Sequence, residues 1–263
     1  MKFTKMHGLG NDYLYVYGEV PKNIAELSIK LSERHFGAGS DGMIYISPSD
    51  VADFKMRIFN ADGSEAKMCG NGIRCVGKYV YDKGYTDKTR LWIETLSGIK
   101  TLELFISDGK VGQVCVEMGK TEVFDEKTLE IDSQKIVCMP VSVGNPHAVI
   151  FVESAEKEPI TEIGPKIEKH TEFKGGVNVE FVQLINEKTL RMRVWERGSG
   201  VTMACGTGAC ASVSAAVKKG YCPVNEWITV RLDGGDLQIK VRENGEVAMQ
   251  GGATFVYEGE TIE

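Results

Sequence analysis

The chain has 263 residues, is 42% hydrophobic, and contains 30 glycines and only 7 prolines, a composition typical of a globular protein with room for two modest domains. A formal net charge of −6, with lysine and arginine spread along the chain, argues against a nucleic-acid-binding surface and favours a small-molecule partner. No stretch approaches the roughly 20 apolar residues of a membrane span, and the first residues lack the apolar region of a signal peptide, so we expect a cytoplasmic protein.

The first half contains two glycine-rich motifs, Gly10-Asn11-Asp12 near the start and a longer block that begins at Arg57, RIFNADGSEAKMCGNGIRCVGKYVYDKGY. The second block predicts a helix over residues 71–83, which follows Cys69 and stops at Gly84, because glycine is the expected residue just past a helix C-terminus. After it, alternating and β-branched residues over 91–106 predict two strands joined by a glycine turn.

The second half repeats this order. The motif Gly144-Asn145-Pro146-His147 lies 134 residues after the first, and the block from Arg193, RVWERGSGVTMACGTGACASVSAAVKKGY, aligns without a gap at an offset of 136. Cys205 then matches Cys69, a helix over 207–219 matches the first and stops at Gly220, and residues 227–241 predict the next strand pair. A fixed offset of this kind indicates a duplicated architecture.

Both helix candidates lack a clean polar face, which is typical of helices buried on every side. We therefore expect each half to wrap strands around one helix, with a cysteine at the helix N-terminus. The positive end of the helix dipole is expected there to lower the pKa of the thiol. The N–H groups of the next two residues, Gly70 and Asn71 or Gly206 and Thr207, are suited to a substrate carboxylate.

An approximate two-fold relation would place the two thiols on opposite sides of one cleft. Removal of a proton from one face of a carbon and return of a proton to the other face inverts that carbon, and this requires two groups whose protonation states exchange. The sequence therefore predicts an epimerase with Cys69 and Cys205 as acid and base, and no metal or organic cofactor is required.

The five other cysteines are expected to be inert packing residues, since reduced cysteine is among the most buried residue types. A zinc site is disfavoured by the cysteine spacing and by the presence of only four histidines. Three further alternatives remain weaker: a phosphate-binding glycine loop, a covalent cysteine nucleophile with His147 as its base, and a non-enzymatic binding module.

The motifs KMHGLGND, RHFGAGSDG, FNADGSEAKMCGNGIRC, VGNPH, GVNVEF and VWERGSGVTMACGTGA cover most of the chain, which resembles the diaminopimelate epimerase family. The resemblance implies an α/β (α+β) fold of two pseudo-symmetric domains, each a mixed β-barrel-like sheet around a central helix. The implied division is 1–118 with Cys69, 119–250 with Cys205, and a tail 251–263 packed on the first domain.

The same resemblance implies interconversion of LL-2,6-diaminopimelate and meso-diaminopimelate in lysine and peptidoglycan precursor synthesis, without pyridoxal phosphate, by a cytoplasmic homodimer. It implies four catalytic residues, Cys69, Cys205, His147 and Glu196. The implied substrate-binding residues are Asn11, Asn60, Gly70, Asn71, Asn145, Asn178, Glu196, Arg197, Gly206 and Thr207.

The repeat differs where Asn60-Ala61 of the first half becomes Glu196-Arg197 in the second. The added charges suit a substrate with a second amino-acid group at its far end, because a guanidinium binds a carboxylate through two parallel hydrogen bonds. A departure from the family pattern occurs at Gly42, where some relatives carry a longer polar side chain. Gly42 is therefore left out of the expected substrate contacts.

Overall fold

The computed structural model describes residues 1–262, and the contacts among them divide the chain into two compact units. The first unit consists of Met1–Val116 and Gly251–Glu263, and the second of Glu117–Gln250. No helix in residues 1–262 is both long and apolar enough to cross a membrane.

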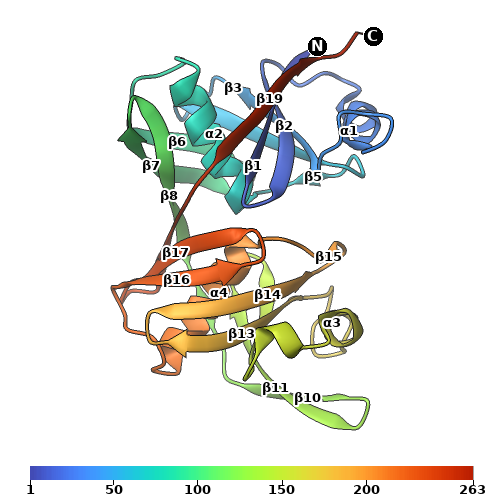
Figure 1. Cartoon of the computed structure of the whole chain (residues 1–263), viewed down its shortest axis with the longest axis vertical. Coiled ribbons are helices and arrows are strands. Elements are labelled where there is room, and N and C mark those ends of the chain that lie inside the picture. Colours follow the sequence, from blue (N-terminus) through green and yellow to red (C-terminus); the bar gives the residue numbers. More distant parts are fainter. Residues whose placement is uncertain (263) are drawn as a thin grey trace. The chain divides into compact units, whose positions relative to one another are not determined.

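The first unit is a mixed sheet with two helices (Figure 1). Its elements in chain order are β1 (Lys2–Gly8), β2 (Asn11–Tyr17), α1 (Ile24–Ser32), β3 (Gly42–Ser47), β4 (Phe54–Asn60), β5 (Glu65–Ala66), α2 (Gly70–Asp82), β6 (Arg90–Thr95), β7 (Gly98–Ser107), β8 (Lys110–Lys120) and, from the C-terminal segment, β19 (Thr254–Glu260).

The second unit has the same order of elements after two added strands (Figure 1). These are β9 (Glu122–Val123), β10 (Lys127–Ile131), β11 (Gln134–Ser142), β12 (Pro146–Phe151), a 3-10 turn (Ala155–Lys157), α3 (Ile160–Glu168), β13 (Asn178–Asn186), β14 (Thr189–Glu196), β15 (Gly200–Val201), α4 (Gly206–Lys218), β16 (Trp227–Leu232), β17 (Gly235–Val241) and β18 (Glu246–Gly251).

The strand pairings of the two units are the same. In the first unit β1–β2 and β3–β4 are antiparallel, whereas β2–β3 and β4–β6 are parallel. In the second unit β11–β12 and β13–β14 are antiparallel, and β12–β13 and β14–β16 are parallel. The duplication predicted from the sequence is therefore confirmed in the topology, as is the mixed sheet around a central helix.

Each central helix starts one residue earlier than the sequence suggested, at Gly70 and at Gly206, because the preceding cysteine is the N-cap. Both helices stop before a glycine with positive φ, Gly84 at 78° and Gly220 at 71°, the left-handed conformation that glycine adopts without strain. Both are buried along most of their length, in agreement with their small and apolar side chains.

The outer helices α1 and α3 were not expected. In α1, Ile24, Leu27 and Leu31 pack on a cluster with strand residues such as Met43 and Phe59. In α3, Ile160, Ile163 and Ile167 pack in the same way on strand residues of the second unit. Since both triplets follow the i, i+3, i+7 spacing of one helix face and lie 136 residues apart, each sheet is covered by a helix on its outer face and encloses another on its inner face.

Candidate active site

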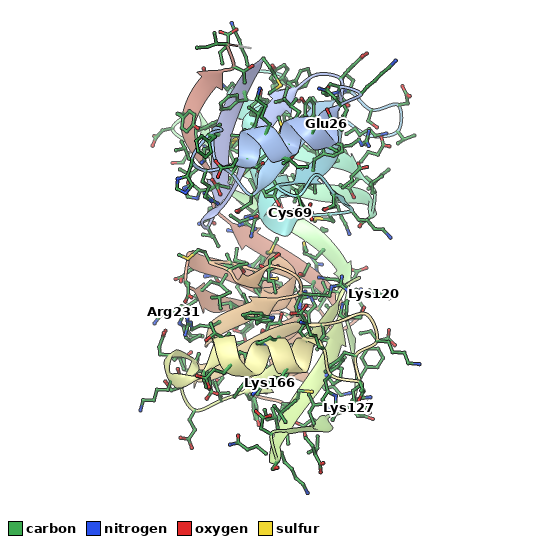
Figure 2. The ribbon with its side chains drawn as sticks, turned by 90° about the vertical axis from the view of Figure 1, so that its right-hand side faces the viewer. Glu26, Cys69, Lys120, Lys127, Lys166 and Arg231 are labelled. Atoms are coloured by element: carbon green, nitrogen blue, oxygen red, sulfur yellow. The ribbon has the colours of Figure 1, made fainter. Side chains whose placement is uncertain are left out.

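The cysteine of each repeat is the N-cap of the central helix, and its sulfur accepts a hydrogen bond from a backbone N–H of the first turn. Figure 2 labels Cys69 at the start of α2. The backbone N–H of Gly72 donates to Cys69 Sγ at 3.3 Å. The backbone N–H of Gly208 donates to Cys205 Sγ at the same distance. Backbone N–H groups that lack intrahelical partners therefore point at both sulfur atoms.

Cys69 also contacts a side-chain amide. The thiol donates to Asn11 Oδ1 at 3.3 Å, and Asn11 in turn donates through Nδ2 to Asp41 Oδ2 at 2.8 Å. Asp41 also accepts a hydrogen bond from the backbone N–H of Asp12. These contacts fix the orientation of the Asn11 side chain, so that its carbonyl oxygen is directed at the sulfur.

The two residues that follow Cys69 are buried, Gly70 as the first residue of α2 and Asn71 as the second. Arg74, which is fully buried, donates to Gly70 O at 3.1 Å and to Asn71 Oδ1 at 3.1 Å. Asn60 ends β4 and donates through Nδ2 to Ser64 Oγ at 3.1 Å. Within the first unit, Asn11 and Cys69 thus contact each other, while Asn60 bonds to the following turn.

Cys205 has a different environment, because carboxylates surround it. Burial, followed by the charges of Glu196 and Glu180, raises the pKa of the Cys205 thiol well above its ordinary value, and the hydrogen bonds from Thr207 and the Gly208 N–H only partly oppose this. The sequence-based expectation of a lowered pKa is therefore wrong for Cys205. Desolvation and two neighbouring negative charges outweigh the helix N-terminus.

A chain of polar contacts leads to this sulfur from β12. Cys205 Sγ lies 3.5 Å from Thr207 Oγ1, which accepts a hydrogen bond from Asn145 Nδ2 at 3.3 Å. Asn145 Oδ1 lies 3.1 Å from His147 Nε2, and His147 Nδ1 lies 2.6 Å from Glu180 Oε1. The structure therefore joins three expected site residues, Asn145, His147 and Thr207, to Cys205.

Glu196, the last residue of β14, accepts a hydrogen bond from Thr202 Oγ1 at 2.5 Å. Burial raises the pKa of its carboxyl group, although hydrogen bonds with Thr202 and Cys205 act in the opposite direction. Glu196 is thus a half-buried acid in hydrogen-bond contact with the Cys205 sulfur. This is the arrangement in which a carboxyl group changes the protonation of a neighbouring thiol.

Asn178 and Arg197 lie at neighbouring strand ends, where the Arg197 N–H donates to Asn178 Oδ1 at 2.8 Å. The Arg197 side chain is exposed and donates to Gly175 O at 2.9 Å. Gly206, the first residue of α4, is buried next to Cys205. The Arg197 guanidinium thus donates to a neutral backbone acceptor, and a guanidinium has five N–H donors in all.

Gly42 occupies the position in the first unit that matches Asn178 in the second. Its φ is 151°, and a Cβ built on it would lie 2.1 Å from Phe59 O. No side chain fits there unless the backbone moves, so the absence of a polar side chain at Gly42 is built into the pairing of β3 with β4.

Sequence reasoning missed Asp41 and Glu180. Asp41 lies in the quoted motif RHFGAGSDG, and Glu180 is the only charged residue of GVNVEF, in a strand that is otherwise apolar or amide-bearing. A lone acid in a buried strand is unusual, and this signal could have identified Glu180.

Comparison with known proteins agrees with the motifs. Residues 3–124 and 139–256 match the model of the family described as diaminopimelate epimerase. The chain is 55% identical to the diaminopimelate epimerase of Methanococcus maripaludis over 99% of both chains, and 51% identical to that of Acetivibrio thermocellus over 99% of this chain and 98% of the relative.

The fold is also shared with more distant proteins. A Bacillus anthracis protein of the PhzF phenazine biosynthesis family superposes with a TM-score of 0.79 at 15% identity, over 100% of this chain and 99% of that chain. The family model matches most of the chain. The two relatives match 99% of it at 51–55% sequence identity, far above the 15% of the Bacillus anthracis protein. The chain therefore belongs to the diaminopimelate epimerase family.

Proposed function

We propose that the chain is a diaminopimelate epimerase that interconverts LL-2,6-diaminopimelate and meso-diaminopimelate without an organic cofactor. The observation that carries the proposal is the repeated N-cap cysteine. Two matched units each present a thiol at the N-terminus of a buried helix, with backbone N–H groups directed at the sulfur. Membership of the diaminopimelate epimerase family supports the choice of substrate.

The proposed reaction transfers one proton from the substrate and returns one to it. A thiolate takes the proton from the α-carbon, and the second thiol gives its proton to the opposite face of the same carbon, so the enzyme ends with the two protonation states exchanged. The raised pKa of Cys205 favours its thiol form in the resting enzyme. Cys205 is therefore proposed to act first as the acid, with Cys69 as the base once it has lost the proton that it donates to Asn11 Oδ1.

The raised pKa also helps in the reverse direction. A thiolate formed at Cys205 is a stronger base because its conjugate acid is weaker, which suits a substrate whose α-proton is only weakly acidic. The developing charge on the substrate carboxylate requires donors that are already in place. The proposal assigns this role to the N–H groups that begin the two helices, at Gly70 and Asn71 and at Gly206 and Thr207.

The remaining residues are proposed to assist proton transfer at Cys205 or to bind the substrate. His147 and Glu196 are proposed to control the protonation of Cys205, which Glu196 contacts directly and His147 reaches through Asn145 and Thr207. Arg197 is proposed to bind the distal carboxylate of diaminopimelate, supported by its exposed guanidinium. The proposed amide contacts to the substrate are Asn11, Asn60, Asn145 and Asn178.

The two domains are proposed to follow the sequence repeat. Residues 1–118 and the tail 251–263 form the domain with Cys69, and residues 119–250 form the domain with Cys205. The proposed setting is lysine and peptidoglycan precursor synthesis in the cytoplasm, by a homodimer. These last points depend on the family resemblance. Light scattering of the purified protein measures its mass, and a monomeric mass of 28.9 kDa would exclude the dimer.

The test is incubation of the purified, reduced protein with LL-diaminopimelate in deuterated water without added cofactor, followed by NMR. The expected result is meso product with deuterium at the inverted carbon, because the returned proton comes from a thiol in exchange with solvent. Conversion without deuterium in the product would contradict the two-thiol route. No conversion of diaminopimelate, together with turnover of another amino acid such as proline, would contradict the proposed substrate.

A further inference from the structure

Glu180 is a fully buried acid that the proposed reaction does not yet use. Its side chain has no exposed surface, and among the described residues its Oε2 atom has no hydrogen-bond partner. Burial of a carboxyl group with an unpaired oxygen costs free energy, so such groups are rare unless they have a role. The residue lies in β13, on the face that packs against α4.

The first unit shows that the fold does not require an acid at this place. Ile44 is the residue 136 positions earlier, and a Cβ built on Gly72 of α2 would lie 2.6 Å from Ile44 Cδ1. The matching Cβ on Gly208 of α4 would lie 2.8 Å from Glu180 Oε1. Both side chains therefore fill the same space against the central helix, and an apolar side chain is sufficient for packing.

The hydrogen bonds around Glu180 have a defined direction. Asn145 Nδ2 donates to Thr207 Oγ1, so the carbonyl oxygen of the same amide faces His147 and requires a hydrogen on Nε2. The 2.6 Å contact between His147 Nδ1 and Glu180 Oε1 must then contain one proton, held by one of the two atoms. Thr207 Oγ1 already accepts a hydrogen bond, so its own hydrogen is available to Cys205 Sγ.

We propose that Glu180 is a positioning residue for Cys205, which holds His147 so that Asn145 and Thr207 direct the Thr207 hydroxyl at the sulfur. The inference rests on the proposed function, because it gives the aligned hydroxyl a use in stabilising the Cys205 thiolate during turnover. The titratable groups that face Glu180 are His147 from β12, Cys205 at the start of α4 and Glu196 at the end of β14. The proton shared with His147 is retained throughout the reaction.

The test compares two substitutions that fill the same space. Glu180→Gln keeps an N–H donor for His147 Nδ1, and we expect it to retain kcat within a few-fold of the original protein. Glu180→Ile reproduces the residue of the first unit and removes the partner of His147, and we expect kcat to fall about 10²-fold, the scale of loss when a reacting group is misplaced. Thermal stability of the isoleucine variant should change little, because removal of the unpaired Oε2 atom offsets the loss of the hydrogen bond at His147 Nδ1.

The matched control is Ile44→Val, which shortens the equivalent side chain of the first unit and is expected to lower Tm slightly with kcat unchanged. A merely structural role for Glu180 predicts the opposite pattern, in which the isoleucine variant loses Tm and activity together. Near-original kcat in Glu180→Ile, or an equal loss in Glu180→Gln, would overturn the proposal.

A measurement without substrate separates this proposal from the proposed function. The ring 15N resonances of His147 should show a protonated Nε2 in the original protein and in Glu180→Gln. A shift of these resonances in Glu180→Ile supports the positioning role even if another amino acid proves to be the substrate. Unchanged resonances in Glu180→Ile would contradict the positioning role even where diaminopimelate is converted.

Discussion

Cys205 experiences two opposing influences, since N–H and O–H donors favour its thiolate while burial and carboxylates favour its thiol. From the sequence, the position of Cys205 at a helix N-terminus suggested a lowered pKa and hence a thiolate. Glu180 of β13 and Glu196 of β14 precede Cys205 by 25 and 9 residues, and their proximity to its sulfur follows from the way the sheet wraps around α4. The pKa of a buried thiol therefore depends on tertiary neighbours that a local motif does not reveal.

The first prediction at this scale concerns Glu196→Gln. Loss of the carboxylate removes a charge that raises the pKa of Cys205, so the pKa of the thiol should fall. Because Cys205 is proposed to act from its thiol form, the alkaline limb of the kcat/KM profile should move to lower pH. The control is Glu26→Gln on the outer helix α1 (Figure 2), an exposed position that should leave the profile unchanged. An unmoved alkaline limb in Glu196→Gln would contradict the assignment.

The second prediction concerns Arg197→Lys. This variant retains the positive charge but loses the two parallel N–H donors of the guanidinium group. A hydrogen bond to a charged group contributes about 1.5–3 kcal/mol, so we expect KM for diaminopimelate to rise about 10- to 100-fold. Arg193→Lys is the control, because Arg193 lies on β14, which ends one residue before Arg197, and pairs with Asp233. An equal KM in the two variants would show that Arg197 does not bind the distal carboxylate.

At the scale of single elements, the central helices were the easiest to predict and the outer helices the hardest. Residues 71–83 and 207–219 have strong end signals, namely a glycine stop and a preceding cysteine turn. The outer helices are only nine residues long, and α3 contains Pro165, which disfavours a helix interior. Their signal is the apolar triplet repeated at the offset of 136, which becomes visible only when the two halves are superposed.

The N-caps give the third prediction. Serine is a favoured N-cap residue, so Cys69→Ser and Cys205→Ser should each change the free energy of unfolding by no more than about 0.5 kcal/mol. Activity should fall by about 10³-fold or more, because a hydroxyl cannot replace the thiol as acid or base. Urea unfolding and the NMR assay measure the two effects separately. Cys222→Ala is the control for loss of a thiol outside the helix starts, and its activity should be retained. A fully active serine variant would exclude that cysteine from the reaction.

On the scale of the whole molecule, the duplicated topology, the mixed sheets and the family followed from the sequence because each depends on a pattern that recurs along the chain. The asymmetry between the two thiol environments did not follow, because it depends on single substitutions between the halves. Ile44 against Glu180 and Asn60 against Glu196 are the decisive pairs. A duplicated fold thus supplies two equivalent helix starts, and a few side chains give the two thiols different surroundings.

The remaining prediction belongs to the whole fold and concerns alkaline stability. Burial raises the pKa of Cys75, Cys138 and Cys222 from 9.0 to about 11. A raised folded-state pKa means that the native protein binds these protons more tightly than the unfolded chain does. The resulting stability is fully present below pH 9 and is lost as the pH rises from 9 to 11.

For the fully buried Cys75, a difference of two pKa units corresponds to about 3 kcal/mol. Urea unfolding between pH 8 and pH 10.5, under reducing conditions, should therefore show a free energy of unfolding that decreases steadily above pH 9. Cys75→Ala should be less stable at pH 8, because it leaves a cavity, but its stability should decrease less steeply with pH. Parallel curves for the two proteins would mean that the Cys75 thiol does not contribute to the pH dependence. The alkaline loss would then come from Cys138, Cys222 and tyrosines such as Tyr79, whose pKa is raised to about 12.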